Sequence, residues 1–427
     1  MKLVQKIKKI FKIIGPGVIT GAADDDPSGI ATYTQAGARF GYSQLWTIIF
    51  MLPLVTAVQE ACARIGAVTG KGIASVIKKY YSKKVLSLAV VLILIANTIN
   101  IGADIGAMAE ATRLIIPLNF SILALLFTAL ILILEIFLSY KVYAKFLKWC
   151  ALSLIAYPIT VFLIKHPWWD LLKATFVPHI EFSFGFLFII VGVLGTTISP
   201  YMFFWQASEE VEEEKSHRIF NYGKPKLSEK FMRNLRLDNF LGMLFSQIAA
   251  WCIIVVAGTV LHNNGIIDVK TAADAARALE PLVDTFPNAG LLAKVIFAFG
   301  IVGLGLLSVP VLSASASYAV SEAFSWHEGL NLKFKKAHGF YGVITVATVI
   351  GLMINYVGID PIKALIFTAV INGVVSVPLL FLINKIASDK KIMGKHKSGR
   401  LSRFFLWLTF IIMFLSSMAM FIALSRG

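Results

Sequence analysis

Long apolar stretches, separated by short polar or basic segments, recur from one end of the chain to the other. Many approach the ~20 residues that an α-helix needs to cross the hydrocarbon core of a bilayer. We therefore expect an all-α, multi-pass membrane protein surrounded by lipid. The pattern predicts about eleven spans, at residues 12–39, 43–68, 86–110, 120–139, 144–164, 184–208, 237–261, 289–324, 339–355, 361–383 and 404–424.

Composition and charge support a membrane protein and suggest its orientation. Of the 427 residues, 57% are hydrophobic and 15% are charged, which is too apolar for a water-soluble globule of this size. The net charge of +16 would suggest nucleic acid in a soluble protein, but Lys and Arg are concentrated in alternate connections. The positive-inside rule then predicts a cytoplasmic amino terminus and an external carboxyl terminus in the cell membrane, with no nucleic-acid partner.

Two interruptions of the apolar pattern are the most informative local features. Residues 24–29 (Asp-Asp-Asp-Pro-Ser-Gly) interrupt the first span, and residues 195–201 (Gly-Thr-Thr-Ile-Ser-Pro-Tyr) interrupt the sixth. Proline removes a backbone donor and disfavours helical angles at the residue before it, and glycine eases unwinding. Because five spans separate the breaks, the two halves have opposite orientations. Such paired broken helices are typical of the central binding site of a transporter.

The three consecutive aspartates indicate what binds there. A charged side chain at the bilayer centre costs roughly 2.5–3.5 kcal/mol, and no Lys or Arg lies between Lys12 and Arg39 in the first span. A bound cation is the simplest compensation. A second interpretation is that Asp26 caps the outer half-helix while Asp24 and Asp25 face water. Capping and cation binding are compatible at Asp26.

Catalytic chemistry is not indicated. The sequence has no nucleotide-binding loop, Ser-His-Asp set or metalloprotease motif, and its loops leave no room for a soluble catalytic domain. We therefore expect no enzyme activity, no cofactor and no obligatory protein partner. The three cysteines, Cys62, Cys150 and Cys252, are far apart and are interpreted as core packing.

At the two breaks the chain resembles the Nramp family of divalent metal transporters, whose motifs are Asp-Pro-Gly-Asn and Met-Pro-His. The present sequence has Asp26-Pro27-Ser28-Gly29 and Ser199-Pro200-Tyr201, and its run from Gln59 to Gly72 is similar to the family's stretch closing the second helix. The resemblance implies an inverted five-plus-five fold of the leucine-transporter type, with helices 1 and 6 unwound at mid-membrane and an eleventh helix appended. The implied segments are a cytoplasmic tail (1–11), a transporter core (12–383, with repeats 12–164 and 184–383), a cytoplasmic basic loop (384–403) and an additional helix with a short external end (404–427).

The resemblance also implies a metal site. Its ligands map to Asp26, the carbonyl groups of Ala23 and Thr196, Gly29 in place of asparagine, Ser199 in place of methionine and Asn372 in place of glutamine. Further candidates are Asp25, Thr197 and Tyr201. Loss of a thioether leaves oxygen ligands, which suit Mg²⁺ and Mn²⁺, and Mg²⁺ retains several waters because it dehydrates reluctantly. The pattern is closest to the Nramp-related magnesium transporters, so we expect alternating-access transport of partly hydrated Mg²⁺, and also Mn²⁺.

Coupling and gating residues are predicted with alternatives. Asp104 matches a proton-coupling aspartate of the family, but Ala107 and Tyr201 replace its glutamate and histidine, which predicts transport without obligatory proton coupling. Glu60 and Arg64, spaced i and i+4, are expected to form an internal ion pair or a gate. The acidic run 209–214 is expected to be a solvated cytoplasmic loop or, alternatively, a cation-attracting exit.

Two other transport functions stay open. One is a proton-coupled Mn²⁺/Fe²⁺ importer of the Nramp type. The other is a sodium-coupled organic-solute symporter on the same fold, which would need a substrate-sized apolar pocket and would not require Asp26.

Overall fold

The computed structural model describes residues 16–137, 154–216, 220–221, 224–225 and 227–426. The predicted tail 1–11 and the first part of the predicted fifth span lie outside the described residues. The described part of the first half is helical throughout, with elements α2 (Pro16–Asp24), α3 (Pro27–Phe40), α4 (Leu45–Thr69), α5 (Ile73–Tyr80), α6 (Lys83–Arg113), α7 (Phe120–Phe137), α9 (Ala156–Leu163) and α10 (Trp168–Phe176).

The second half is also mainly helical. It adds one short hairpin with two residues in each strand, in which β1 (Phe220–Asn221) pairs antiparallel with β2 (Lys224–Pro225). Its main helices are α11 (Phe184–Thr197), α12 (Pro200–Ser216), α13 (Glu229–Val260), α14 (Ala272–Arg277), α15 (Ala289–Phe324), α16 (His338–Ile354), α17 (Pro361–Ser388), α18 (Lys390–Met393) and α19 (Arg400–Arg426). Short 3-10 turns are η2 (His262–Asn264), η3 (Glu280–Leu282), η4 (Phe334–Lys336) and η5 (Gly394–His396).

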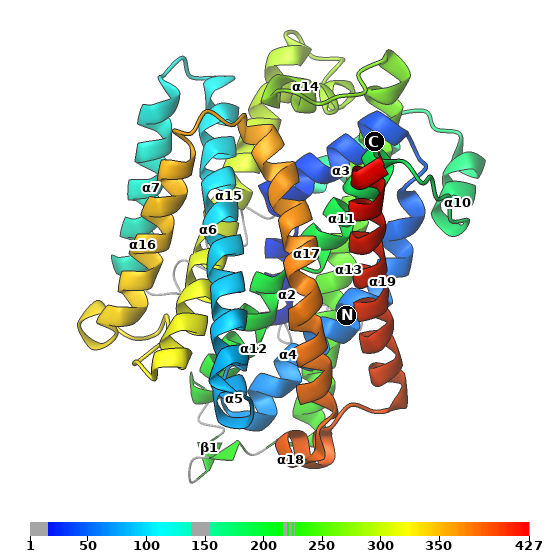
Figure 1. Ribbon diagram of the computed structural model, residues 1–427. Helices are drawn as coiled ribbons and strands as arrows, with labels where there is room; N and C mark the ends of the chain where they lie inside the picture. Colours follow the sequence, from blue (N-terminus) through cyan, green and yellow to red (C-terminus); the bar gives the residue numbers. More distant parts are fainter. Residues whose placement is uncertain (1–15, 138–153, 217–219, 222–223, 226, 427) are drawn as a thin grey trace, which may run out of the picture.

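The long helices stand side by side in one bundle (Figure 1). Among the described residues, eight helices are long and apolar enough to cross a membrane, counting α11 and α12 together, and α16 is a shorter apolar helix. The first predicted span is divided into α2 and α3, and α9 lies within the fifth. The prediction of an all-α, multi-pass membrane protein is therefore confirmed.

Helix ends follow local side-chain chemistry. Ser82 and Ser228 begin α6 and α13 by accepting bonds from the backbone N–H groups three residues later. Asp360 caps α17 in the same way, with Pro361 at the first helical position. Gly70 ends α4 with a φ of 63° and a ψ of 24°, a left-handed conformation that glycine adopts without steric cost.

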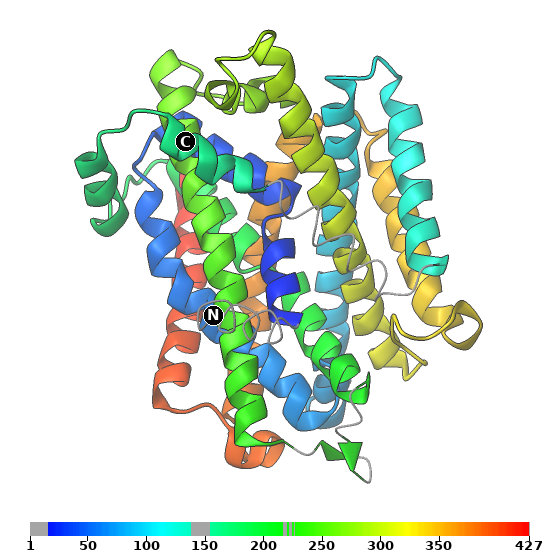
Figure 2. The same ribbon diagram turned by 180° about the vertical axis from the view of Figure 1, so that it is seen from behind.

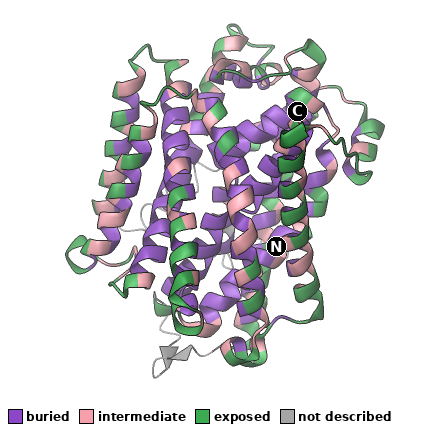
Figure 3. Ribbon diagram, in the orientation of Figure 1, coloured by how far each residue is buried: buried purple, intermediate pink, exposed green. Residues whose placement is uncertain are grey.

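Burial separates a packed interior from a lipid-facing surface. Buried residues occupy the middle of the bundle, and exposed residues follow the outer faces of helices such as α19 (Figure 3). Large apolar side chains are among the exposed ones, including Phe162 (80%), Phe299 (64%) and Val346 (58%). Apolar surface on this scale is expected of a protein whose solvent is lipid.

Close helix contacts position the two broken spans. From behind, α13 runs alongside α2 and α3 (Figure 2), and α11 packs against α17. A Cβ atom on Gly21 would come within 2.2 Å of the Gly242 carbonyl oxygen, and one on Gly195 within 2.1 Å of the Ala369 carbonyl oxygen. Only glycine permits this approach of the backbones, which holds the second break against α17.

The basic connections gather at one end of the bundle. Figure 1 shows α5, β1 and α18 at one end, with α14 and the carboxyl-terminal end of α19 at the other. Elements α5, β1, β2 and α18, which belong to the Lys- and Arg-rich segments 69–84, 209–236 and 384–403, therefore lie on the same side. The predicted loop 384–403 is partly helical, because α17 continues to Ser388 and α19 begins at Arg400.

Candidate functional site

The first break lies between Asp24, the last residue of α2, and Pro27, the first residue of α3. Asp26 is the N-cap of α3, and its Oδ1 accepts bonds from the Gly29 N–H (2.8 Å) and the Ser28 hydroxyl (2.5 Å). Its Oδ2 accepts a bond of 3.1 Å from the Asn100 amide of α6. The predicted capping role of Asp26 is therefore confirmed, and its side chain is 1% exposed.

The second break lies between Thr197 and Pro200, where Ile198 takes a φ of −110° and a ψ of 57°. The freed carbonyl groups find hydroxyl partners within the protein. The Ser199 hydroxyl lies 2.7 Å from the carbonyl oxygens of both Gly195 and Thr196, and Ser376 of α17 donates to the Ile198 carbonyl at 2.6 Å. These bonds satisfy backbone acceptors that lipid could not.

The two breaks are in direct contact although some 170 residues separate them. The Tyr201 hydroxyl donates to the Ala23 carbonyl at 2.8 Å. A second bond of 2.7 Å joins the hydroxyls of Tyr33 and Thr197, and the hydroxyls of Ser28 and Thr196 lie 3.4 Å apart. These contacts bring Ala23, Ser28 and Tyr33 of the first break against Thr196, Thr197 and Tyr201 of the second, in a buried polar region.

Gly29 lies between the two breaks, and Asn372 is a buried amide on α17, the helix that packs against the second break. A Cβ on Gly29 would lie 3.2 Å from Thr196 Oγ1 and 3.4 Å from the Asp24 carbonyl oxygen, so Gly29 fills the narrow space between the breaks. Asn372 of α17 is 1% exposed, and neither side-chain atom of its amide has a hydrogen-bond partner. An unsatisfied buried amide is costly, and its oxygen is a suitable cation ligand.

Asp24 and Asp25 are fully buried, so the interpretation that they face water is wrong. The Ser246 hydroxyl of α13 lies 2.5 Å from Asp24 Oδ2 and 3.2 Å from Asp25 Oδ1. The other oxygen of each carboxyl group has no partner. The close approach of α13 to α2 is the physical reason, because it removes this side of the break from water.

The donor set of the centre is made of oxygen atoms from several groups. Within the described residues, no three His, Cys, Asp or Glu side chains gather in a way that could hold a metal ion. A cation here would need carbonyl, hydroxyl and amide oxygens in addition to Asp26. Such a mixed set suits hard divalent cations that keep part of their water shell.

Comparison with known proteins decides the family. Residues 17–423 match the family described as Nramp, natural resistance-associated macrophage protein-like. The chain belongs to the Nramp family.

This Nramp chain is similar to curated relatives along most of its length. It is 25% identical over 406 residues to a divalent metal cation transporter MntH of Caldanaerobacter subterraneus subsp. tengcongensis, covering 93% of this chain and 90% of the relative. It is 26% identical over 423 residues to MntH of Ralstonia nicotianae, covering 95% and 89%. Family membership makes the chain a membrane transporter and not an enzyme.

Solved structures show the same fold. The Nramp chain aligns with a manganese transporter of Eremococcus coleocola at a TM-score of 0.75 and 16% identity, covering 96% of this chain and 86% of the other. It aligns with MhsT in complex with L-phenylalanine at a TM-score of 0.62 and 11% identity, covering 95% and 98%. The predicted leucine-transporter-type fold, with helices 1 and 6 unwound, is confirmed.

Asp104 lies close to the site through α6. It is four residues from Asn100, so the two side chains share one helix face, and Asn100 contacts Asp26. The Ser308 hydroxyl of α15 donates to Asp104 Oδ2 at 2.6 Å, and Asp104 Oδ1 has no partner. The buried carboxyl group of Asp104 therefore lies one helical turn from Asn100, the residue that contacts Asp26.

Glu60 and Arg64 form the predicted ion pair, with Arg64 Nε 2.9 Å from Glu60 Oε1. Arg64 also donates to the His396 carbonyl (2.6 Å) and the Ser398 hydroxyl (3.0 Å), and Arg236 of α13 lies 3.2 Å from Glu60. The pair thus joins α4 to α13 and to the segment before α19. A gating role stays a prediction.

The acidic run 209–214 does not form a loop, and this prediction is wrong. It belongs to α12, and Glu209, Glu210, Glu212 and Glu214 are buried. Glu212 has partners from distant segments: the Tyr318 hydroxyl and the backbone N–H groups of Leu330 and Asn331. These hydrogen-bond donors offset the cost of burying a glutamate. Without them, a run this polar would be expected on the surface.

Sequence reasoning missed the residues that bond the buried acids, namely Ser28, Asn100, Ser246 and Ser308, and two that bond the second break, namely Tyr33 and Ser376. A polar residue within an apolar span was the available signal. That signal is shared by serines that only bond their own helix or a neighbouring backbone, so it could not single these residues out.

We expect Ser246→Ala to lower the melting temperature of the purified protein, because it leaves two buried carboxyl groups without their shared donor. Such a loss costs about 1–3 kcal/mol. The matched control is Ser321→Ala, since Ser321 is also fully buried but its hydroxyl has no partner. Equal melting temperatures for the two variants would contradict the role given to Ser246.

Proposed function

We propose that this chain carries divalent metal cations across the membrane by alternating access, with Mn²⁺ as the principal ion. The observation that carries the proposal is the meeting of the two helix breaks around Asp26 in one buried, oxygen-lined centre. The names of the relatives, divalent metal cation transporter and manganese transporter, support Mn²⁺. They favour the Mn²⁺ alternative over the Mg²⁺ preference predicted from sequence, and metal transport over the organic-solute alternative.

The proposed cation ligands are Asp26, Ser199, the Asn372 amide and the carbonyl oxygens of Ala23 and Thr196. Each of these carbonyl oxygens already accepts a hydroxyl bond, from Tyr201 and Ser199 respectively. A carbonyl oxygen has two lone pairs, so it can accept a hydroxyl and still coordinate a cation. Asp25, Thr197 and Gly29 lie beside these ligands and shape the centre.

Mg²⁺ is the second candidate ion. Ser199 stands where the Nramp motif has methionine, so no sulfur atom is among the proposed ligands. A thioether favours transition metals, whereas oxygen ligands accept Mg²⁺ as well as Mn²⁺. We therefore propose that the site binds Mn²⁺ and also accepts Mg²⁺.

The proposed orientation has the amino terminus in the cytoplasm and the carboxyl terminus outside. It is supported by the alternation of Lys and Arg along the sequence and by the position of α5, β1 and α18 at one end of the bundle. The inverted halves, residues 12–164 and 184–383, are proposed to rock against one another around the fixed centre.

Asp26→Asn tests the metal role apart from the capping role. Asparagine also caps helices, so α3 should persist while the charge is lost. Losing one member of a buried ion pair costs about 3–5 kcal/mol, so we expect Mn²⁺ uptake into proteoliposomes to fall by roughly two to more than three orders of magnitude.

The control for this variant is Asp360→Asn, which changes the Asp-Pro pair that caps the start of α17. It should transport normally. Unchanged uptake by Asp26→Asn, in protein that elutes as a folded species in gel filtration, would refute the proposed site.

Ser199→Met tests the ion preference. We expect the preference for Mn²⁺ over Mg²⁺, measured as competition of Mg²⁺ with Mn²⁺ uptake, to rise by about tenfold, which corresponds to about 1.4 kcal/mol. An unchanged preference in a transport-competent variant would mean that position 199 does not select the ion.

Flux is proposed to follow the metal gradient and the membrane potential without obligatory proton coupling. Ala107 and Tyr201 occupy the family's glutamate and histidine positions, and the Tyr201 hydroxyl is committed to the Ala23 carbonyl. We expect Mn²⁺ entry to leave the internal pH of dye-loaded vesicles unchanged. Acidification that disappears in Asp104→Asn would contradict this and assign proton coupling to Asp104.

A further inference from the structure

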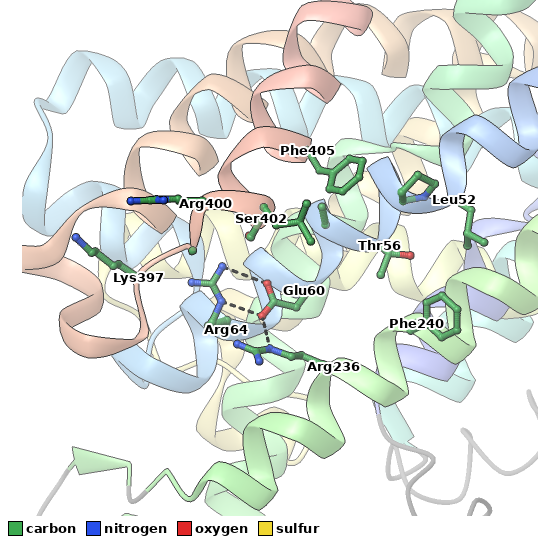
Figure 4. Close-up of a pocket in the computed structure, with 14 residues that line it drawn as sticks. Leu52, Thr56, Glu60, Arg64, Arg236, Phe240, Lys397, Arg400, Ser402 and Phe405 are labelled. Atoms are coloured by element: carbon green, nitrogen blue, oxygen red, sulfur yellow. Dashed lines mark hydrogen bonds and ion pairs between the residues drawn. The ribbon is translucent and has the colours of Figure 1, made fainter.

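A second pocket lies well away from the helix breaks, between α4, α13 and the start of α19 (Figure 4). Its volume is about 610 Å³, which is within the range of small-molecule sites. Part of the lining is apolar, formed by Leu52, Pro53, Phe240, Leu401 and Phe405. The remainder is dominated by four basic side chains, those of Arg64, Arg236, Lys397 and Arg400.

The positive charge of this pocket exceeds its negative charge. Glu60 is the one carboxylate in the lining, and both Arg64 and Arg236 already bind it. In the part of the chain that the structure describes, neither Lys397 nor Arg400 takes part in an ion pair. Two exposed cations at one end of the pocket are therefore available for an anion (Figure 4).

The pKa of a neighbouring histidine is affected by the same positive charges. His396 lies directly before this basic segment, and its carbonyl oxygen accepts the bond from Arg64. Burial, together with the positive charges of Lys395, Arg64 and Arg236, lowers the pKa of the His396 imidazole. Burial is the larger cause of this shift, and only the contribution of the three positive charges would also stabilise an anion at the same place.

The apolar part of the pocket is open to the lipid. Leu401 is 70% exposed and Phe240 is 40% exposed, and both are on helices that cross the bilayer. The basic residues lie near helix ends: Arg236 is in the first turns of α13, Lys397 precedes α19, and Arg400 begins α19. Apolar surface beside clustered Lys and Arg at these helix ends matches the two parts of a phospholipid, its acyl chains and its phosphate.

We propose that this pocket binds an anionic phospholipid, with its phosphate at Lys397 and Arg400 and its acyl chains against Leu52, Phe240 and Phe405. The lipid joins α4 and α13 to the segment before α19, where Arg64 already holds the His396 carbonyl and the Ser398 hydroxyl. Bound lipid therefore stabilises this corner of the bundle. This site is separate from the proposed metal centre and stands or falls independently of it.

The test uses the full chain purified in a neutral detergent. Phosphatidylglycerol and phosphatidylcholine with identical acyl chains are titrated separately, and lipid retention by native mass spectrometry and the melting temperature are measured. We expect phosphatidylglycerol to be retained and to raise the melting temperature more than phosphatidylcholine does. In the double variant Lys397→Gln/Arg400→Gln, the apparent affinity for phosphatidylglycerol should fall by roughly tenfold or more.

The matched control is Lys390→Gln/Lys391→Gln, which removes the same charge from exposed residues of α18 outside the pocket. It should bind phosphatidylglycerol like the unaltered chain. Equal losses in both double variants would overturn the proposal in favour of general surface attraction. Stabilisation by inorganic phosphate equal to that by phosphatidylglycerol would overturn it in favour of a soluble anion, and equal retention of the two lipids would overturn it outright.

Discussion

Carboxyl groups removed from water must be compensated by other groups, and the centre of this protein is organised around that requirement. Asp24, Asp25, Asp26 and Asp104 are all buried, and none of them takes part in an ion pair among the residues that the structure describes. Their partners are neutral: serine hydroxyls, an asparagine amide and backbone N–H groups. Neutral donors orient a carboxyl group without supplying an opposite charge, so a cation that enters the centre can supply it.

The helix breaks raise the same problem for the backbone. Each proline frees carbonyl groups that lipid cannot satisfy, and hydroxyls supply the bonds: Tyr201 of the second break bonds Ala23 of the first, Ser199 bonds Thr196 within the second break, and Ser376 of α17 bonds Ile198. The first break therefore depends on the second for its Ala23 carbonyl, and the pair produces a polar region enclosed by apolar helix faces. Family membership and fold agree with this arrangement, because both are those of transporters with paired broken helices.

Features with a local physical cause could be predicted from the sequence. Pro27 and Pro200 determine where the breaks occur, Asp26 caps the helix that follows it, and the spacing of Glu60 and Arg64 produces their ion pair. The lengths of the apolar runs gave the spans to within a few residues in most cases. Each of these features depends on a short stretch of chain whose chemistry has few alternatives.

Features that depend on tertiary partners could not be predicted. The burial of Asp24 depends on Ser246, 222 residues away, and that of Glu212 depends on the Tyr318 hydroxyl and the backbone of the segment at 330. From composition alone, a run of glutamates indicates a solvated loop. The same run is stable inside a protein when donors from other helices meet it, and a single sequence does not show which donors those are.

The hydroxyls at the breaks have a consequence for the timing of transport. An alternating-access transporter must also return to its starting conformation without a bound ion. That return step is slow when the ligands of the ion have no other partner. Here the Ala23 and Thr196 carbonyl oxygens hold bonds from Tyr201 and Ser199 with no cation required. In the proposed mechanism these two ligands stay hydrogen-bonded whether or not a cation is bound, so the unloaded return step has a lower barrier than it would if both carbonyl oxygens were left unpaired.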